Sequence, residues 1–136
     1  MMGETMTSIK PTKQQSVSSD KLCLETVNFR SHCPVARTLD VLGDKWTLVI
    51  MRDALVFGAR TYADFASQVE RIPTNLLAQR LKRLVELGML AKVKYQAKPP
   101  RYEYVPTPQG KALKPMLREA RKFGEAYLAD EHAKSP

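Results

Sequence analysis

The chain has few of the residues that build disulfide frameworks, zinc sites or catalytic centres. Its 136 residues include two cysteines, Cys23 and Cys33, and two histidines that lie far apart in the sequence. Two cysteines make no disulfide framework, and no cysteine–histidine cluster has zinc-finger spacing. A glycine-rich phosphate loop and a nucleophile elbow are also missing. We therefore expect no metal, no cofactor and no enzymatic activity.

Long apolar runs are missing too. No run approaches the roughly 20 residues that cross a bilayer, and the first residues lack the apolar core of a signal peptide. We therefore expect a cytoplasmic protein with no membrane partner. The polar, aperiodic residues 1–20 predict a flexible N-terminal tail. Residues 21–130 should form one domain, followed by a C-terminal tail over 131–136.

Acidic residues are in the minority. Lysine and arginine total 22 against 14 aspartates and glutamates, which gives a formal net charge of +8. Polyanions are the natural partners of such a surface, nucleic acid first and an anionic membrane second. A solvated charged face on a small α+β domain is the alternative interpretation.

An amphipathic helix and a basic hairpin occupy residues 72–105. At 100° per residue, one side of the helix is apolar and the opposite side is rich in hydrogen-bond donors. The apolar side holds Leu77, Leu81, Leu84 and Gly88, and the donor side holds Asn75, Gln79, Lys82, Arg83 and Glu86. Pro73 suits the first helical turn, and Gly88 can end the helix in a left-handed conformation. Amide and guanidinium groups on a free helix face can bond base edges.

The hairpin should consist of strands over 90–95 and 101–105. Val93 and Tyr95 alternate with lysines, which predicts one packed face and one basic face. The tip holds Lys98 and two prolines. RNA binding usually needs aromatic residues on an open sheet face. The only candidates are Tyr102 and Tyr104, which we expect to pack.

Three further helices are predicted before this stretch. The first begins at Pro34 with Cys33 as its cap, and the second is a core helix over 45–57 capped by Asp44. Trp46 fits the core better than a ligand contact. The third runs over 61–69, with Thr61 and Asp64 as a weak capping box. Its inward residues should be Tyr62, Phe65, Ala66 and Val69. A short third helix joined tightly to a donor-rich fourth indicates a helix-turn-helix.

A last helix should run from Pro108 to about residue 130, bent or split at Pro115. It carries a broad apolar stripe: Met116, Leu117, Ala120, Phe123, Gly124, Tyr127 and Leu128. The stripe can fold back on the chain's own core or form a dimer interface. We favour the dimer, because DNA half-sites lie about 34–36 Å apart and suit two recognition helices.

With these residues in view, the chain resembles the HxlR family of winged helix-turn-helix transcriptional regulators. The matching stretches occur in family order and cover about residues 33 to 128. They include Cys33-Pro34-Val35, Gly43-Asp44-Lys45-Trp46-Thr47, Arg60-Thr61-Tyr62-Ala63-Asp64-Phe65, Ile72-Pro73-Thr74-Asn75-Leu76-Leu77 and Arg101-Tyr102-Glu103-Tyr104. Arg71 stands where the family commonly has glycine.

The resemblance implies a mainly α member of the α+β class, a winged helix-turn-helix domain with a two-stranded wing. Extra N- and C-terminal helices would join two chains into a homodimer that binds operator DNA. Some members resemble redox or electrophile sensors with a cysteine just before the first helix, and Cys33 matches that position. A thiol at a helix N-terminus has a lowered pKa. The alternative is an inert, half-buried cysteine.

These observations predict double-stranded DNA as the partner, with a small molecule or oxidant as a candidate effector. Bases would be read by Asn75, Gln79 and Arg83, flanked by Thr74 and Lys82. Phosphates would be held by Arg60, Thr61 and Tyr62, and from the wing by Lys94, Lys98 and Arg101. Arg80, also placed among the backbone contacts, should pair with an acid or a phosphate rather than a base. The competing hypothesis is a winged-helix adaptor whose basic surface meets acidic protein.

Overall fold

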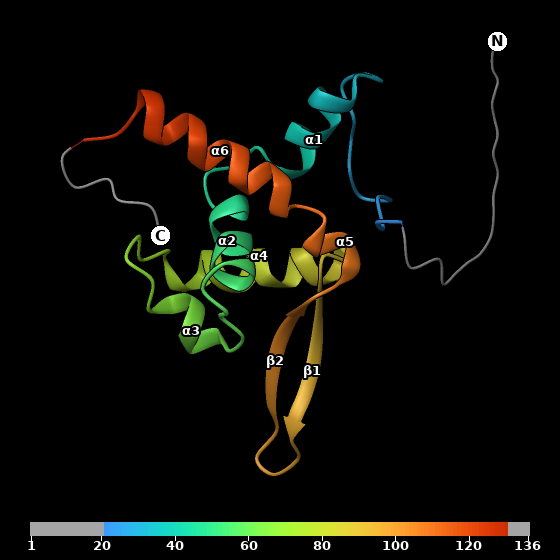
Figure 1. Ribbon diagram of the computed structural model, residues 1–136. Coiled ribbons are helices and arrows are strands. Elements are labelled where there is room, and N and C mark those ends of the chain that lie inside the picture. Colours follow the sequence, from blue (N-terminus) through green and yellow to red (C-terminus); the bar gives the residue numbers. More distant parts are fainter. Residues whose placement is uncertain (1–20, 131–136) are drawn as a thin grey trace.

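The computed structural model describes residues 21–130, so the tails predicted over 1–20 and 131–136 lie outside the described residues. Within them, six helices form the body, and one antiparallel hairpin projects from it on the side opposite α1 and α6 (Figure 1). The elements are α1 (Pro34–Leu42), α2 (Thr47–Leu55), α3 (Tyr62–Ala66), α4 (Thr74–Leu87), β1 (Leu90–Gln96), β2 (Arg101–Pro106), α5 (Pro108–Lys111) and α6 (Lys114–Tyr127). The expected mainly helical domain with a two-stranded wing is confirmed.

Helices α2 and α4 supply much of the hydrophobic core. The buried residues of α2 include Ile50, Met51 and Ala54, and those of α4 are Leu77, Leu81, Leu84 and Leu87. Burial of each leucine contributes about 1.5–3 kcal/mol. The predictions that α2 is a core helix and that the leucine side of α4 is buried are confirmed. Trp46 is partly buried against this core.

Helix α1 begins and ends where the sequence predicts. Cys33 is its N-cap, Pro34 its first residue and Gly43 its C-cap. Its apolar side is only partly covered, however. Val41 and Leu42 are buried, whereas Val35 is 68% exposed and Leu39 is 51% exposed. Val35 and Leu39 of α1 therefore present apolar surface to solvent.

Helix α3 is shorter than predicted. The capping box of Thr61 and Asp64 is present, but the helix ends at Ala66, and Val69 is 86% exposed. The expected inward positions of Ala66 and Val69 are therefore wrong. Side chains of Ser67 and Gln68 donate to the Asp64 carbonyl at 2.9 and 3.0 Å. This carbonyl would accept the next backbone N–H of a longer helix, so the two side chains favour a turn there.

Helix α4 begins at Thr74, with Pro73 as its N-cap, one residue later than predicted. Gly88 ends it with φ of 94°, as expected for a left-handed glycine cap. The Gly88 N–H donates to the Leu84 and Val85 carbonyls, and the Met89 N–H donates to Leu84 at 2.9 Å. The cap turns the chain directly into β1.

The hairpin packs on the domain only at its base. Leu90 pairs with Pro106 and both are buried, but Val93 is 45% exposed and Tyr95 is 50% exposed. The predicted packed face is therefore wrong beyond the base, because the hairpin extends away from the helices (Figure 1). Tyr104 packs edge-on against Phe65, with ring centroids 6.3 Å apart.

Thr107 and Pro115 divide the C-terminal helical segment as predicted. The Thr107 hydroxyl accepts the Gly110 N–H at 3.1 Å and donates to the Gly88 carbonyl at 2.6 Å. Helix α5 ends at Lys111, and α6 begins at Lys114 with Pro115 in its first turn. No residue of α6 is buried, and Phe123, Tyr127 and Leu128 of the apolar stripe are 59%, 75% and 74% exposed, so the described residues leave much of the stripe uncovered. Across residues 21–130, no helix is both long and apolar enough to cross a membrane.

Candidate nucleic-acid interface

One face of α4 presents polar side chains to solvent. Thr74, Asn75, Gln79 and Lys82 are all exposed. The buried leucines fix the rotation of α4 about its own axis, so the polar side chains on the opposite side face solvent. Within residues 21–130, the side chains of Gln79 and Lys82 have no hydrogen-bond or ion-pair partner. Two donors at i and i+3 on one exposed helical face can approach the same groove edge.

Arg83 is not on this exposed face. It is half-buried, and its Nη1 donates to the Val41 carbonyl at 2.8 Å. The prediction that it lies opposite the leucines is wrong because Arg83 sits at the flank of α4, beside the end of α1. The last carbonyls of a helix have no partner within the helix, and a guanidinium can satisfy them.

Arg80 lies nearer the core and pairs with an acid, as predicted. Its Nε donates to Asp44 Oδ2 at 2.9 Å. Asp44 Oδ2 also accepts the backbone N–H groups of Trp46 and Thr47, and its Oδ1 accepts the Thr47 hydroxyl. Burial opposes the charge on Asp44, but hydrogen bonds from Thr47 and Arg80 outweigh it and lower the pKa to about 2. The carboxylate thus ties α4 to the start of α2.

The groups expected to meet phosphate at the start of α3 are engaged inside the domain. Arg60 Nη1 donates to the Ala54 and Ala59 carbonyls at 2.9 and 2.8 Å. The Thr61 N–H donates to Asp64 Oδ2 at 3.0 Å, which occupies one of the N–H groups expected for phosphate. The Tyr62 hydroxyl donates to the Thr74 carbonyl at 2.9 Å and links α3 to α4. These contacts hold the helix-turn-helix together, and the prediction that Arg60, Thr61 and Tyr62 also meet phosphate stays a prediction.

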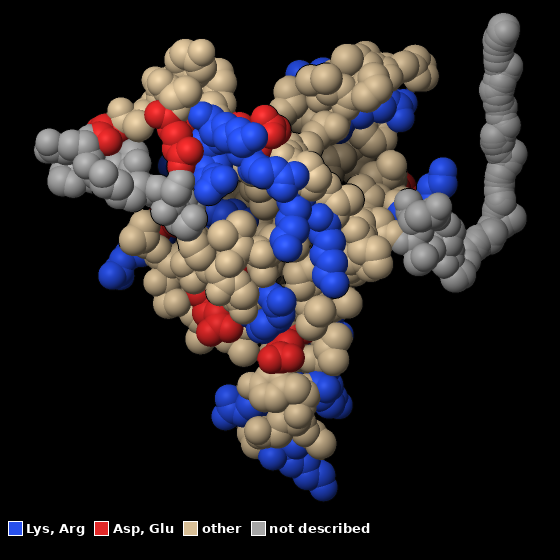
Figure 2. Space-filling view, in the orientation of Figure 1, with Lys and Arg blue, Asp and Glu red and all other residues tan. Residues whose placement is uncertain are grey.

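Basic residues do gather on the wing. Lys94, Lys98 and Arg101 are exposed, and Figure 2 shows Lys and Arg side chains at the far end of the hairpin. Lys92 joins them, with its Nζ 4.6 Å from the centroid of the Tyr102 ring. Tyr102 was expected to pack but is 38% exposed, because it lies beyond the helices on the lysine face. The ring attracts the Lys92 ammonium and holds it on this face of the wing.

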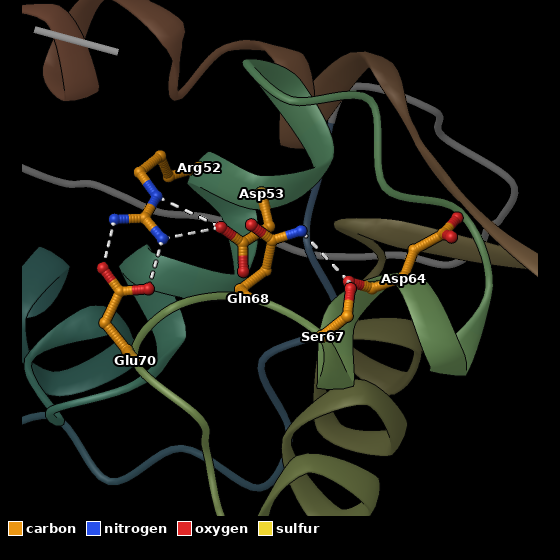
Figure 3. Close-up of polar contacts among 6 residues, drawn as sticks. All are labelled: Arg52, Asp53, Asp64, Ser67, Gln68 and Glu70. Atoms are coloured by element: carbon orange, nitrogen blue, oxygen red, sulfur yellow. Dashed lines mark hydrogen bonds and ion pairs between the residues drawn. The ribbon is translucent and has the colours of Figure 1, made fainter.

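An ion-pair cluster that the sequence did not predict supports the turn before α4. Arg52 Nη1 and Nη2 each donate to a Glu70 carboxylate oxygen at 2.8 Å, and Nη2 also meets Asp53 Oδ1 at 2.7 Å (Figure 3). The hydrogen bond from Arg52 lowers the pKa of Glu70, whereas burial raises the pKa of Asp53. Arg52 lies in α2 and Glu70 lies in the turn after α3. No helical or strand periodicity in the sequence could therefore indicate that they meet.

Known proteins share part of the sequence of this chain. The family model described as HxlR-like helix-turn-helix matches residues 41–132. Over 94 residues the chain is 38% identical to the uncharacterised HTH-type transcriptional regulator MT3179 of Mycobacterium tuberculosis, covering 69% of this chain and 58% of that protein. It therefore spans less than two thirds of that relative. Identity to the HTH-type regulator YdeP of Bacillus subtilis is 30% over 95 residues, 70% of this chain and 73% of YdeP.

Solved structures of other proteins share the fold of this chain. The crystal structure of the transcription-factor candidate PA1607 matches with a TM-score of 0.68 and 37% identity, over 79% of this chain and 72% of that one. The oxidised form of the redox regulator HypR matches with a TM-score of 0.61 and 29% identity, over 72% of this chain and 99% of HypR.

A short helix, a tight turn, a longer second helix with an exposed polar face, and a basic hairpin define a winged helix-turn-helix domain, a class of DNA-binding fold. The matched model and relatives make the assignment specific: the chain belongs to the HxlR-like helix-turn-helix family. Its relatives are transcription regulators, a class that is generally not enzymatic.

Proposed function

We propose that this chain is a homodimeric regulator that reads a specific DNA sequence with α4. The observation that carries the proposal is the exposure of Asn75, Gln79 and Lys82 opposite a fully buried leucine side. Asn and Gln amides can bond adenine bidentately in the major groove, and Lys can bond guanine. Arg83 is assigned a positioning role instead, because its guanidinium holds α4 against the Val41 carbonyl.

The wing supplies contacts that do not depend on sequence. Lys92, Lys94, Lys98 and Arg101 are exposed on the hairpin, which extends away from the helices (Figure 1). Thr74 begins α4, whose N-cap Pro73 offers no side-chain hydrogen bond. The Leu76 N–H donates to Asn75 Oδ1 at 3.0 Å, which leaves the N–H groups of Thr74 and Asn75 for a phosphate. Such contacts position the protein on the duplex, while base contacts specify the site.

A second copy would cover the apolar surface at the top of the molecule. On α6, Phe123 is 59% and Tyr127 is 75% exposed, and their rings lie 5.1 Å apart. Val35 and Leu39 leave a further apolar surface on α1. Contiguous apolar patches of this kind mark interaction sites. A twofold dimer would present two copies of α4 to successive half-sites.

The candidate signal is oxidation or alkylation of Cys33. This thiol is exposed at the N-cap of α1, and the backbone N–H groups of Ala36 and Val35 lower its pKa. The thiolate is the form that attacks an electrophile or is oxidised. The likeness to HypR, described as a redox regulator, supports this part of the proposal.

Selection of bound sequences from a random duplex pool tests the regulator against the adaptor. A regulator binds every duplex with strong salt dependence and binds a preferred site about a thousandfold or more tighter. Binding without any preferred site, at every salt concentration, would contradict sequence-specific recognition and favour an adaptor.

Replacement of Cys33 tests the sensing role. Diamide should change the operator affinity of the wild type and leave that of Cys33→Ser unchanged, because only the wild type keeps the thiol at the helix N-terminus. Cys23→Ser is the matched control, since Cys23 is also exposed. The measurement is operator binding by fluorescence anisotropy before and after treatment. An equal response in wild type and Cys33→Ser would exclude Cys33 as the sensor.

A further inference from the structure

A groove of about 720 Å³ lies between α2 and α6. Its apolar lining is contributed by Leu48, Val49, Val56, Leu117, Ala120, Gly124 and Leu128. This volume falls in the range of about 300–1,000 Å³ typical of small-molecule sites. The groove lies away from the wing and from the exposed face of α4, so DNA binding does not account for it.

The charges that line the groove are mostly positive. The cationic residues are Arg52, Lys114, Arg118 and Arg121, and Glu125 is the acid. Figure 2 shows basic side chains gathered over α6. Apolar walls with guanidinium groups suit a molecule with an apolar body and a carboxylate or sulfonate head, because arginine binds such heads bidentately.

The groove and the proposed dimer surface use different faces of α6. Met116, Phe123 and Tyr127 recur on one face, and Leu117, Gly124 and Leu128 lie about 100° further round the helix. A second copy docked through the groove in a twofold arrangement would bring two copies of this mostly basic lining together. Like charges repel, so charge complementarity favours an anionic ligand over another copy of this chain.

Arg52 of α2 lines the groove and also contacts the turn of the helix-turn-helix. Its guanidinium lines the groove and bonds both oxygens of Glu70 at 2.8 Å (Figure 3). Glu70 is followed by the left-handed residue Arg71 and then by Pro73, the N-cap of α4. An anion bound at Arg52 would compete with Glu70 for the same N–H donors. Loss of the Arg52–Glu70 pair would release the turn that positions α4.

We propose that the α2–α6 groove binds a small organic anion with an apolar body through Arg118 and Arg52, and that binding weakens operator affinity through the Arg52–Glu70 pair. The effect on DNA rests on the proposed function, whereas the site itself does not. Couplings between sites typically change affinity by about 5–150-fold.

Fluorescence titration of the full chain with 8-anilinonaphthalene-1-sulfonate tests the site without DNA. Arg118→Gln should weaken binding about tenfold, the worth of a hydrogen bond to a charged group. Gly124→Leu should also weaken it, since a Cβ at Gly124 meets no atom within 4 Å and a leucine there fills the groove. Lys122→Gln is the matched control, because Lys122 is absent from the lining and pairs with Glu119.

Glu70→Gln tests whether Glu70 and the bound anion compete for Arg52. Glu70 does not line the groove, so a purely structural role would leave probe affinity unchanged. The proposal expects about fivefold tighter probe binding, the lower end of typical coupling, and loss of the probe's effect on operator affinity. Glu119→Gln, an acid-to-amide change outside the groove lining, should behave as wild type in both assays.

Two results would overturn the proposal. One is equal probe affinity in the wild type, Arg118→Gln and Gly124→Leu. The other is absence of probe binding together with conversion of Arg118→Gln or Gly124→Leu to monomer in sedimentation, which would make the groove a subunit interface. A chain that binds the probe with the expected variant pattern but has no preferred duplex would contradict the proposed function and leave the site standing.

Discussion

Arg71 adopts a backbone conformation that suits glycine. Its φ is 52°, in the left-handed region, directly before the segment that leads into α4. The left-handed conformation costs an L-residue about 1–2 kcal/mol, which glycine avoids. Arg71 stands where the family commonly has glycine and therefore carries a backbone strain that glycine would avoid. The pattern of polar and apolar residues does not reveal this strain.

Arg71→Gly should be more stable than Arg71→Ala by about 1 kcal/mol, because both lose the guanidinium and only alanine keeps the strained Cβ. Urea unfolding of the two variants measures the difference in free energy of unfolding. Equal stability, or a more stable alanine variant, would mean that the backbone strain at residue 71 is negligible.

Local hydrogen bonding made some residues predictable. The caps at Cys33–Pro34 and Thr61–Asp64 and the ending at Gly88 depend on neighbours in sequence, and the structure has all three. The partners of Arg83 and Arg60, the Val41 and Ala54 carbonyls, could not be predicted because they belong to other elements. The partner of a long cationic side chain depends on which helix end lies beside it.

Among the elements, α5 touches Met89, between α4 and β1, so closely that a side chain on Gly110 has no room. A Cβ built on Gly110 would lie 2.1 Å from the Met89 carbonyl oxygen, which is backbone and cannot swing aside. Gly124 differs, because a Cβ there meets no atom within 4 Å. The glycine at residue 110 thus sets the distance between α5 and the start of the wing.

Gly110→Ala should lower the free energy of unfolding by about 1–3 kcal/mol, the usual cost of overpacking. Gly124→Ala should instead raise it by about 0.5–1 kcal/mol, because alanine favours a helix over glycine. Chemical denaturation of both variants against wild type measures these effects. A Gly110→Ala variant as stable as wild type would show that α5 can shift at no cost.

The spacing of apolar residues predicted the helices and strands of residues 21–130, but it did not predict all of their ends or exposed faces. The leucine spacing of α4 and the apolar content of α2 are properties of single segments, so they could be seen in the sequence. The length of α3 and the exposure of Val93 could not. They depend on a side-chain turn after Ala66 and on a hairpin that outreaches the helices.

At the scale of the whole molecule, the uncovered stripe of α6 sets the expected assembly. Phe123→Ala combined with Tyr127→Ala should shift the chain towards monomer, since each aromatic contributes a large apolar area to an interface. Analytical ultracentrifugation at several concentrations measures the shift. Val93→Ala is the control, because this exposed residue lies on the wing. A monomeric wild type, or an unchanged double variant, would contradict the proposed dimer surface.

The account depends on the exposed face of α4 reading bases. The most direct test is the affinity of Gln79→Ala for the selected operator and for a scrambled duplex at one salt concentration. Gln79→Ala should lose about 1–3 kcal/mol on the operator and nothing on the scrambled duplex, whereas Lys98→Ala should weaken both alike. An equal loss on the two duplexes, or no loss on either, would contradict base reading by α4.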